Sequence, residues 1–150
     1  MSTTAGPAKL RELVAELEPL PRDQRMEELI DWADRFVPVD PGIATRPYPE
    51  IHRAPRCESD AYVFATDRED GTLQLHFAVE NPQGLSAKAW AMILNDVASG
   101  APLEEVAAID PDAIWRIFGR DLSMGKGQGL IGMLELVQRE ARKRIDARRG

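Results

Sequence analysis

The strictest pattern in the sequence is an alternation over residues 73–79, which read LQLHFAV. It predicts a half-buried strand, because successive side chains of a strand point to opposite faces. A run of aromatic and small residues at 61–66 predicts a partner strand, and Asp70-Gly71 between the two runs predicts a hairpin turn. A third strand is expected at 51–55, in an edge position because prolines flank it.

Apolar residues at helical spacing lie on both sides of this hairpin in the sequence. Before it we expect helices at 10–17 and 22–36, then an extended crossover at 37–49, which contains four prolines. After it we expect a helix capped by Ser86 and stopped by Gly100, a short helix at 102–108, a helix opened by Asp110-Pro111 and ending at Gly119, and a long helix from about Leu130 to Ile145. This order predicts an α+β fold, a small antiparallel sheet with helices packed on one face.

A chain of 150 residues is long enough for one hydrophobic core, with no disulfide or metal needed to hold it. We expect a single domain over residues 9–145, a flexible N-terminus at 1–8 and a flexible C-terminus at 146–150.

The net charge of −6 argues against nucleic acid as a partner, because binding to phosphates requires a basic surface. No apolar run is long enough to cross a bilayer, and the first residues lack the pattern of a secretory signal. We therefore expect a cytoplasmic protein whose partner is another protein.

The chain contains one cysteine, Cys57, which excludes an intramolecular disulfide and any multi-cysteine metal site within one chain. No metal site and no bound cofactor are expected. Arg53 and Arg56 precede the thiol and favour thiolate, whereas Glu58 and Asp60 follow it and oppose thiolate. From the residues alone, a functional thiol and a structural one stay open. A functional thiol has no second cysteine to resolve it, so it must react with a group from outside the chain.

The sequence has two histidines, His52 and His76, and His76 is expected to be solvated on the polar face of its strand. His52 can pair with Cys57 only if the chain bends between them, since the two side chains point to opposite faces of an extended segment.

The glycine-rich stretch 119–132 matches neither a P-loop nor a dinucleotide fingerprint in context, because a helix precedes it and no βαβ unit surrounds it. Two interpretations stay open. The glycines either form an adaptable loop and helix start, or allow close backbone approach or an anion at a free helix end.

Three segments together resemble the SufE-like sulfur acceptor family, also called the Fe–S metabolism associated domain, over roughly residues 9–137. The family's cysteine loop usually reads Gly-Cys-Gln-Ser or Glu-Cys-Gln-Thr before an aromatic strand, and its late motif is Leu-Ser-x-x-Arg-x-Asn-Gly-Leu-x-x-Met. The corresponding residues here are Arg56-Cys57-Glu58-Ser59 before Tyr62-Val63-Phe64, then Gly84 to Leu94 as the family's next helix, and finally Leu122-Ser123, Lys126, Gln128-Gly129-Leu130 and Met133.

The resemblance implies a sulfur acceptor and carrier rather than an enzyme in its own right. It implies that Cys57 takes sulfane sulfur as a persulfide from a SufS-like cysteine desulfurase, stimulates that enzyme, and passes the sulfur toward an iron–sulfur scaffold. The pyridoxal phosphate of this chemistry belongs to the desulfurase. The residues that the resemblance assigns to partner binding are Arg56, Glu58, Ser59, Lys126, Gln128 and Gly129.

Four of these positions depart from the family pattern: Arg56, Glu58, Lys126 and Gln128. Lysine in place of arginine removes a planar, bidentate donor. Two alternatives therefore remain: a module that binds and regulates a desulfurase without carrying sulfur, and a one-cysteine thiol enzyme.

Overall fold

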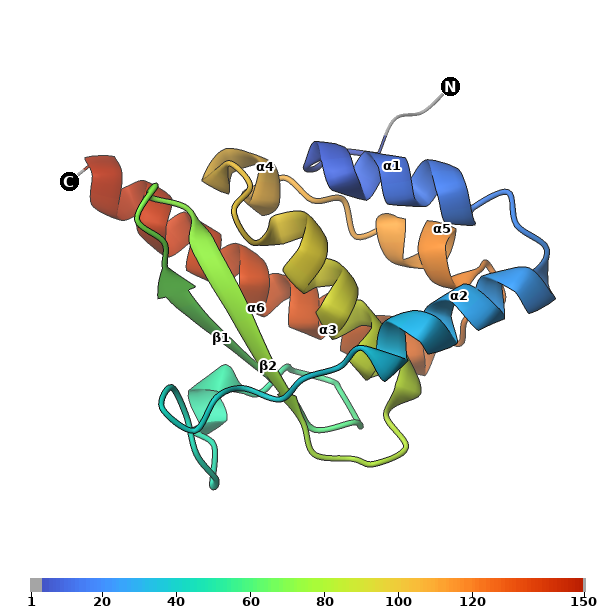
Figure 1. The fold of residues 1–150 in the computed structure, drawn as a ribbon, viewed down its shortest axis with the longest axis horizontal. Coiled ribbons are helices and arrows are strands. Elements are labelled where there is room, and N and C mark those ends of the chain that lie inside the picture. The colour runs from blue at the N-terminus through green and yellow to red at the C-terminus, as the bar shows by residue number, and fades with distance from the viewer. Residues whose placement is uncertain (1–3, 150) are drawn as a thin grey trace.

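The computed structural model describes residues 4–149, which form an α+β fold (Figure 1). Two helices come first, then a hairpin, then four more helices. The elements are α1 (Ala8–Leu17), α2 (Arg22–Asp34), the 3-10 turn η1 (Glu50–His52), β1 (Ala61–Asp67), β2 (Leu73–Val79), α3 (Leu85–Ala98), α4 (Leu103–Ala107), α5 (Ala113–Phe118) and α6 (Met124–Arg149).

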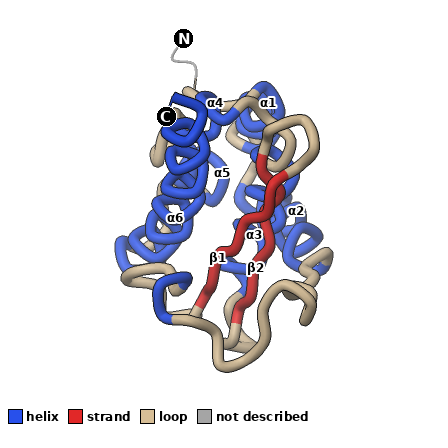
Figure 2. The backbone as a smooth tube through the Cα atoms, turned by 90° about the vertical axis from the view of Figure 1, so that its left-hand side faces the viewer, coloured by secondary structure: helices blue, strands red, loops and turns tan. Residues whose placement is uncertain are grey.

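The sheet is the predicted antiparallel hairpin, with Val63 opposite Phe77 in its register. Gly71 has φ +85°, a conformation that glycine adopts at low cost in the hairpin turn. Helices α3 and α6 pack against one face of the hairpin (Figure 2), as the sequence predicts. Val63, Leu75 and Phe77 point to that face and are almost fully buried.

The opposite face of the hairpin is covered by the proline-rich crossover. Val39, from this crossover, packs with Phe64 and Ala78 in a second, smaller apolar cluster, and the Val39 amide donates to the Phe77 carbonyl at 2.7 Å. The alternation along each strand therefore serves two cores: one set of side chains meets the helices and the other meets the crossover.

The expected strand at 51–55 is wrong. Residues 50–52 form η1, and only Arg53 makes a bridge, to Tyr62. The Ala54 amide still donates to the Ala61 carbonyl at 2.8 Å. Proline cannot donate to a ladder, so the prolines on both sides limit the pairing to this short contact.

The starts of α3 and α5 also differ from prediction. Helix α3 begins at Leu85, after Gly84 and without a side-chain cap, so Ser86 lies inside the first turn. The Asp110 carboxylate does accept a hydrogen bond, from the Asp112 amide at 2.9 Å, but the regular helix α5 begins only at Ala113.

Both chain ends are more structured than the expected flexible segments. Thr4 is buried, the Ala5 carbonyl accepts from the Asp110 amide at 3.1 Å, and Ala8 already belongs to α1. Apolar contact with Ile109 and Leu10 at Gly6 fixes this segment. Helix α6 continues to Arg149, and residues 1–3 and 150 lie outside the described chain.

Candidate functional site

Cys57 lies in a tight loop, residues 54–60, between η1 and β1; we call it the Cys57 loop. Arg56 and Asp60 adopt left-handed backbone conformations, with φ of +60° and +51°. Such conformations are unfavourable for residues other than glycine. Hydrogen bonds from the Glu80 amide to Asp60 O (3.1 Å) and from the Asn81 amide to Ser59 O (3.1 Å) hold the end of the loop against the segment after β2.

The loop lies against α6, which begins six residues earlier than the predicted helix. Ser123 precedes α6 and its Oγ accepts from the Lys126 amide at 3.3 Å, so it caps the helix start. An added Cβ at Gly129 would lie 3.1 Å from Cys57 Cα, and one at Gly132 would lie 2.1 Å from the Pro55 carbonyl oxygen. Gly129 and Gly132 therefore serve close backbone approach, one of the two roles left open by the sequence.

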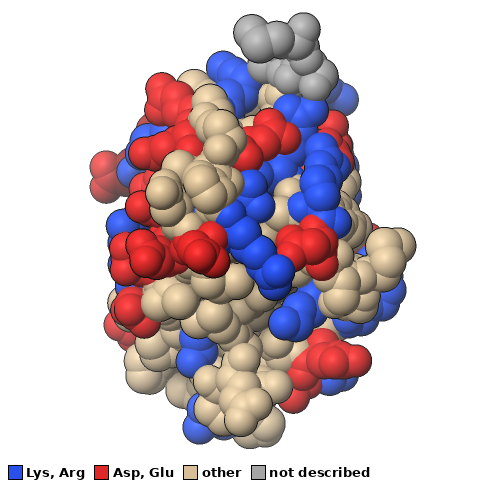
Figure 3. Space-filling model, turned by 90° about the vertical axis from the view of Figure 1, so that its right-hand side faces the viewer, with Lys and Arg blue, Asp and Glu red and all other residues tan. Residues whose placement is uncertain are grey.

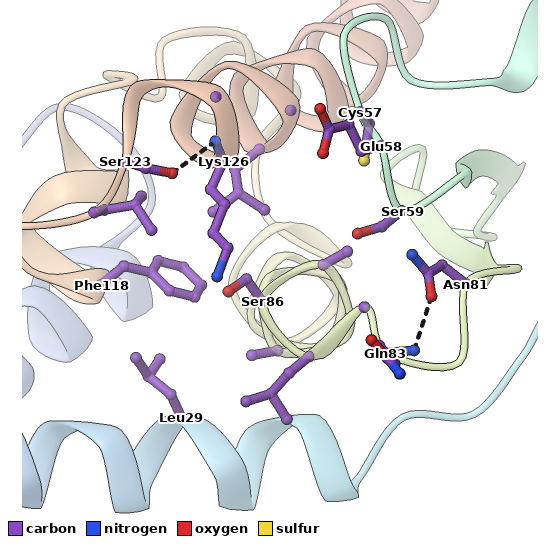
Figure 4. Close-up of a pocket in the computed structure, with 18 of the residues that line it drawn as sticks. Leu29, Cys57, Glu58, Ser59, Asn81, Gln83, Ser86, Phe118, Ser123 and Lys126 are labelled. Atoms are coloured by element: carbon purple, nitrogen blue, oxygen red, sulfur yellow. Dashed lines mark hydrogen bonds between the residues drawn. The ribbon is translucent and has the colours of Figure 1, made fainter.

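The Cys57 side chain is only 8% exposed and lines a cavity of about 600 Å³, the Cys57 cavity (Figure 4). Helices α2, α3, α5 and α6 contribute to this cavity, together with the segment after β2. Its lining includes Arg22, Arg25, Met26 and Leu29 of α2; Glu58 and Ser59; Asn81, Gln83 and Leu85 to Ala87; Phe118 and Leu122; and Gly125, Lys126, Gly129 and Leu130 of α6. The cavity combines apolar walls with hydroxyl and amide groups, the cations Arg22, Arg25 and Lys126, and the carboxylates of Glu58 and Asp121.

Five of the residues selected from the sequence meet at this cavity: Cys57, Glu58, Ser59, Lys126 and Gly129. Two others do not line it. Arg56 turns toward α6 and forms an ion pair with Glu135, its Nη2 lying 2.7 Å from Oε1, and Gln128 lies outside the lining. The contribution of α2 was missed, because Arg22, Arg25 and Met26 carry no motif that links them to a cysteine 31 to 35 positions later in the chain.

The charges around the cavity differ in how they are paired. Arg22 pairs with Asp121 at 3.4 Å, and the Arg25 guanidinium donates to three carbonyls at and just after the end of α1, those of Leu17, Glu18 and Leu20. The Lys126 side chain points into the cavity toward Ser86 and Phe118 (Figure 4), and no carboxylate among residues 4–149 forms an ion pair with it. The cavity therefore offers the Lys126 ammonium to an anionic group.

Arg53 closes the base of the Cys57 loop. Its guanidinium donates to the Asp60 carboxylate, and this hydrogen bond, together with the charge of Asp60, raises the pKa of Arg53 above its ordinary value. His52 does not approach Cys57 in this way: its Nδ1 lies 3.0 Å from the Val63 carbonyl oxygen, and its ring stacks beside Phe64. Cys57 and His52 therefore do not form a dyad.

The face that carries α1, α2 and α5 shows a band of lysine and arginine side chains with acidic side chains on either side (Figure 3). Arg116 and Arg120 both pair with Asp112, at 3.0 and 3.1 Å, and both approach Glu18. Their hydrogen bonds lower the pKa of Asp112 below its ordinary value. The cations on this face are balanced by neighbouring acids.

Two other kinds of site are not found in the described residues. No group of three or more His, Cys, Asp or Glu is arranged there to hold a metal ion. Within the same residues, no helix is both long and apolar enough to cross a membrane.

Fold and site thus define a class: an α+β protein with one thiol beside a partly cationic cavity. The particular family follows from comparison. The model of the SufE family, described as the Fe-S metabolism associated domain, matches residues 11–141. The chain belongs to this family and is associated with iron–sulfur metabolism.

A solved structure supports the same fold. The solution structure of a hypothetical protein from Thermus thermophilus is similar to this chain, with a TM-score of 0.76 and 25% sequence identity over 94% of this chain and 98% of that one. No curated protein matches the chain.

Proposed function

We propose that this protein is a sulfur acceptor that carries sulfane sulfur as a persulfide on Cys57, stimulates a cysteine desulfurase, and delivers the sulfur toward iron–sulfur cluster assembly. Membership of the SufE family supports the pathway. The observation that carries the proposal is the position of the single thiol, which lines the Cys57 cavity together with Lys126.

The transfer is a thiol exchange on sulfur. The Cys57 thiolate attacks the outer sulfur of the desulfurase persulfide, a new S–S bond forms on Cys57, and the S–S bond of the donor breaks. The desulfurase cysteine leaves as a thiolate, and the proton of the outer sulfur stays with it on Cys57. No external oxidant is required, because the sulfane sulfur moves with its oxidation state unchanged.

The cavity suits the product of this step. A persulfide is one sulfur atom longer than a thiol, and a space of about 600 Å³ beside Cys57 accommodates it without repacking the core. The partly apolar walls shield the outer sulfur. The Lys126 ammonium, which points toward Ser86 and Phe118, offers a counter-charge to a carboxylate of the partner. Because the sequence has no second cysteine, no internal disulfide can form and discharge the sulfur.

The test is incubation with a cognate desulfurase and cysteine, followed by intact mass measurement. The mass should rise by one sulfur atom, and Cys57→Ser should show no rise. Absence of uptake from every cognate desulfurase tested contradicts the proposal. Lys126→Ala keeps the thiol and serves as the second variant: we expect weaker desulfurase binding and slower uptake, and unchanged values remove Lys126 from the site.

The burial of Cys57 favours a second candidate, a module that binds and regulates a desulfurase without carrying sulfur. Cys57→Ala separates the two candidates. Full stimulation of the desulfurase by this variant supports regulation alone, whereas loss of stimulation supports transfer. We place both candidate activities in the cytoplasm, where thiols stay reduced.

A further inference from the structure

The segment that carries Cys57 is held by consecutive turns of α6. Gly129 and Gly132 contact its backbone, and Arg139 donates to the Ile51 carbonyl at 3.0 Å. Between these contacts, the Arg56 guanidinium donates to the Glu135 carboxylate at 2.7 Å. Within the described residues, this is the one ion pair that joins the Cys57 loop to α6.

Both residues with strained backbone in the loop are in ion pairs. Arg56 and Asp60 have positive φ and stand on either side of the Cys57–Ser59 segment. Asp60 is paired with Arg53, and Arg56 is paired with Glu135. A left-handed conformation persists in residues other than glycine only where surrounding contacts hold it. The ion pairs are such contacts.

The two pairs differ in what they connect. Arg53 directly precedes the Cys57 loop and Asp60 is its last residue, so their pair closes the base of the loop. Arg56 and Glu135 are 79 positions apart, so their pair joins the loop to a separate helix. Both of these side chains are about half exposed, at 46% and 48%, and are therefore open to salt and to competing ions.

We infer that the Arg56–Glu135 ion pair is a latch that keeps Cys57 against the cavity, and that opening of this latch sets how often the thiol becomes accessible. The two residues are positioning residues and need not touch a substrate. A carboxylate on a docking partner that takes over Arg56 opens the latch. The consequence for sulfur uptake rests on the proposed function, whereas the effect on thiol exposure does not.

The test measures the rate at which iodoacetamide alkylates Cys57 in the full-length protein. Glu135→Gln removes the latch charge while keeping the side-chain shape. The matched control is Glu104→Gln, which breaks another exposed ion pair made by α6, with Arg148 at 3.8 Å, away from the Cys57 loop. Urea unfolding of each variant, measured in parallel, reports global stability.

We expect Glu135→Gln to be alkylated about two- to fivefold faster than the unchanged protein at low salt, as the strength of an exposed ion pair implies. Glu104→Gln should react at the unchanged rate. The difference in alkylation rate between Glu135→Gln and the unchanged protein should shrink at high salt, because salt weakens the Arg56–Glu135 ion pair of the unchanged protein as well. The exchange variant Arg56→Glu with Glu135→Arg should return toward the original rate, because it restores the pair with reversed charges.

Equal rates for Glu135→Gln and the unchanged protein overturn the latch, and so does an equal acceleration by Glu104→Gln. An acceleration that matches the loss of global stability, or a charge exchange that gives no rescue, also overturns it. Because alkylation needs no desulfurase, failure of the latch leaves sulfur uptake untouched, and failure of sulfur uptake leaves the latch untouched.

Discussion

Helix α6 has two halves that contact the rest of the molecule in different ways. Residues 124–132 include four glycines, and residues 133–149 include none. The first half presents bare backbone to the Cys57 loop and to Trp115, whose ring would lie 2.4 Å from a Cβ added at Gly127. The second half uses long side chains: Arg144 bonds to Asp67 of β1 at 2.7 Å, and Arg148 to the Gly71 carbonyl at 3.0 Å.

The difference shows that the first half of α6 is intrinsically less stable as a helix, and that its glycines allow the Cys57 loop to lie close to it. Each glycine inside a helix costs roughly 1 kcal/mol relative to alanine. In the first half, this cost permits the cysteine-bearing backbone to lie directly against the helix. In the second half, which contacts the hairpin and α4 and reaches the Cys57 segment through long side chains such as Glu135 and Arg139, ordinary helix-forming residues and ion pairs suffice.

Gly132→Ala should have the largest effect. The new methyl group would lie 2.1 Å from the Pro55 carbonyl oxygen, so backbone must move. We expect a loss of about 3 kcal/mol in the free energy of unfolding, measured in urea, together with faster alkylation of Cys57. A variant with unchanged stability and unchanged alkylation would refute close contact at this turn.

Arg144→Gln should remove two side-chain contacts of the second half of α6 and lower the stability of the protein. Glu140 is buried at 5% exposure, and Arg144 donates to its Oε1 at 3.1 Å while also bonding to Asp67. Without Arg144, the carboxylate keeps only longer contacts, to Lys143 at 3.4 Å and Arg139 at 3.8 Å. We expect a loss of about 1–2 kcal/mol in urea unfolding.

Arg142→Gln on the same helix is the control for this change, because Arg142 is exposed. Its unfolding free energy should stay within about 0.5 kcal/mol of the unchanged protein. Equal losses of unfolding free energy in Arg144→Gln and Arg142→Gln would show that the Arg144–Glu140 pair makes no specific contribution to stability.

Gly125→Ala should act in the opposite direction to Gly132→Ala. No atom would lie within 4 Å of its new methyl group, so only the helix preference changes. We expect a gain of about 0.5 kcal/mol in stability. Thermal and urea unfolding of Gly125→Ala and Gly132→Ala, measured in parallel, would distinguish glycines that are needed for close contact from glycines that are not. A loss of stability in Gly125→Ala would contradict this distinction.

The smallest effect expected is a pH dependence of the free energy of unfolding. It arises at the hairpin, which packs against the second half of α6. Burial lowers the pKa of His76 below its ordinary value of 6.5, against a weaker opposing effect of Asp40. As the pH falls through 6.5, the unfolded chain therefore binds the proton first, and the free energy of unfolding decreases until the folded protein is protonated as well.

Urea unfolding at about pH 7.5 and 5.5 checks this dependence. His76→Gln should lose less stability than the unchanged protein over that interval. Identical losses in both proteins would assign the pH dependence to other groups.

Much of this arrangement was predictable from local patterns. The alternation at 73–79 predicted the hairpin and its buried face, and the apolar spacing predicted the helices around it. Cys57 stood out because it is alone and lies among charges rather than in an apolar run. Its meeting with Lys126 and Gly129 came from the family motif, since residues about 70 positions apart share no local signal.

What sequence reasoning missed depends on tertiary contact. The early start of α6 was missed because glycines normally disfavour a helix, whereas here three of them pack closely against Trp115, Cys57 and Pro55. The ion pair of Arg56 was missed for the same reason: Glu135 lies on a helix whose orientation no periodicity reveals. Binding of Arg56 to another protein stays a prediction. The part played by α2 in the cavity wall likewise follows from packing.

The indole of Trp90 has a consequence for experiment. Trp90 is fully buried and donates from Nε1 to the Leu130 carbonyl at 3.0 Å, and Trp115 lies against Gly127, so two of the three tryptophans touch the glycine-rich half of α6. The third, Trp32, lies under the Arg35 guanidinium, 4.3 Å from its ring centroid. Intrinsic tryptophan fluorescence can therefore follow changes in packing between α6 and the Cys57 loop without an added dye.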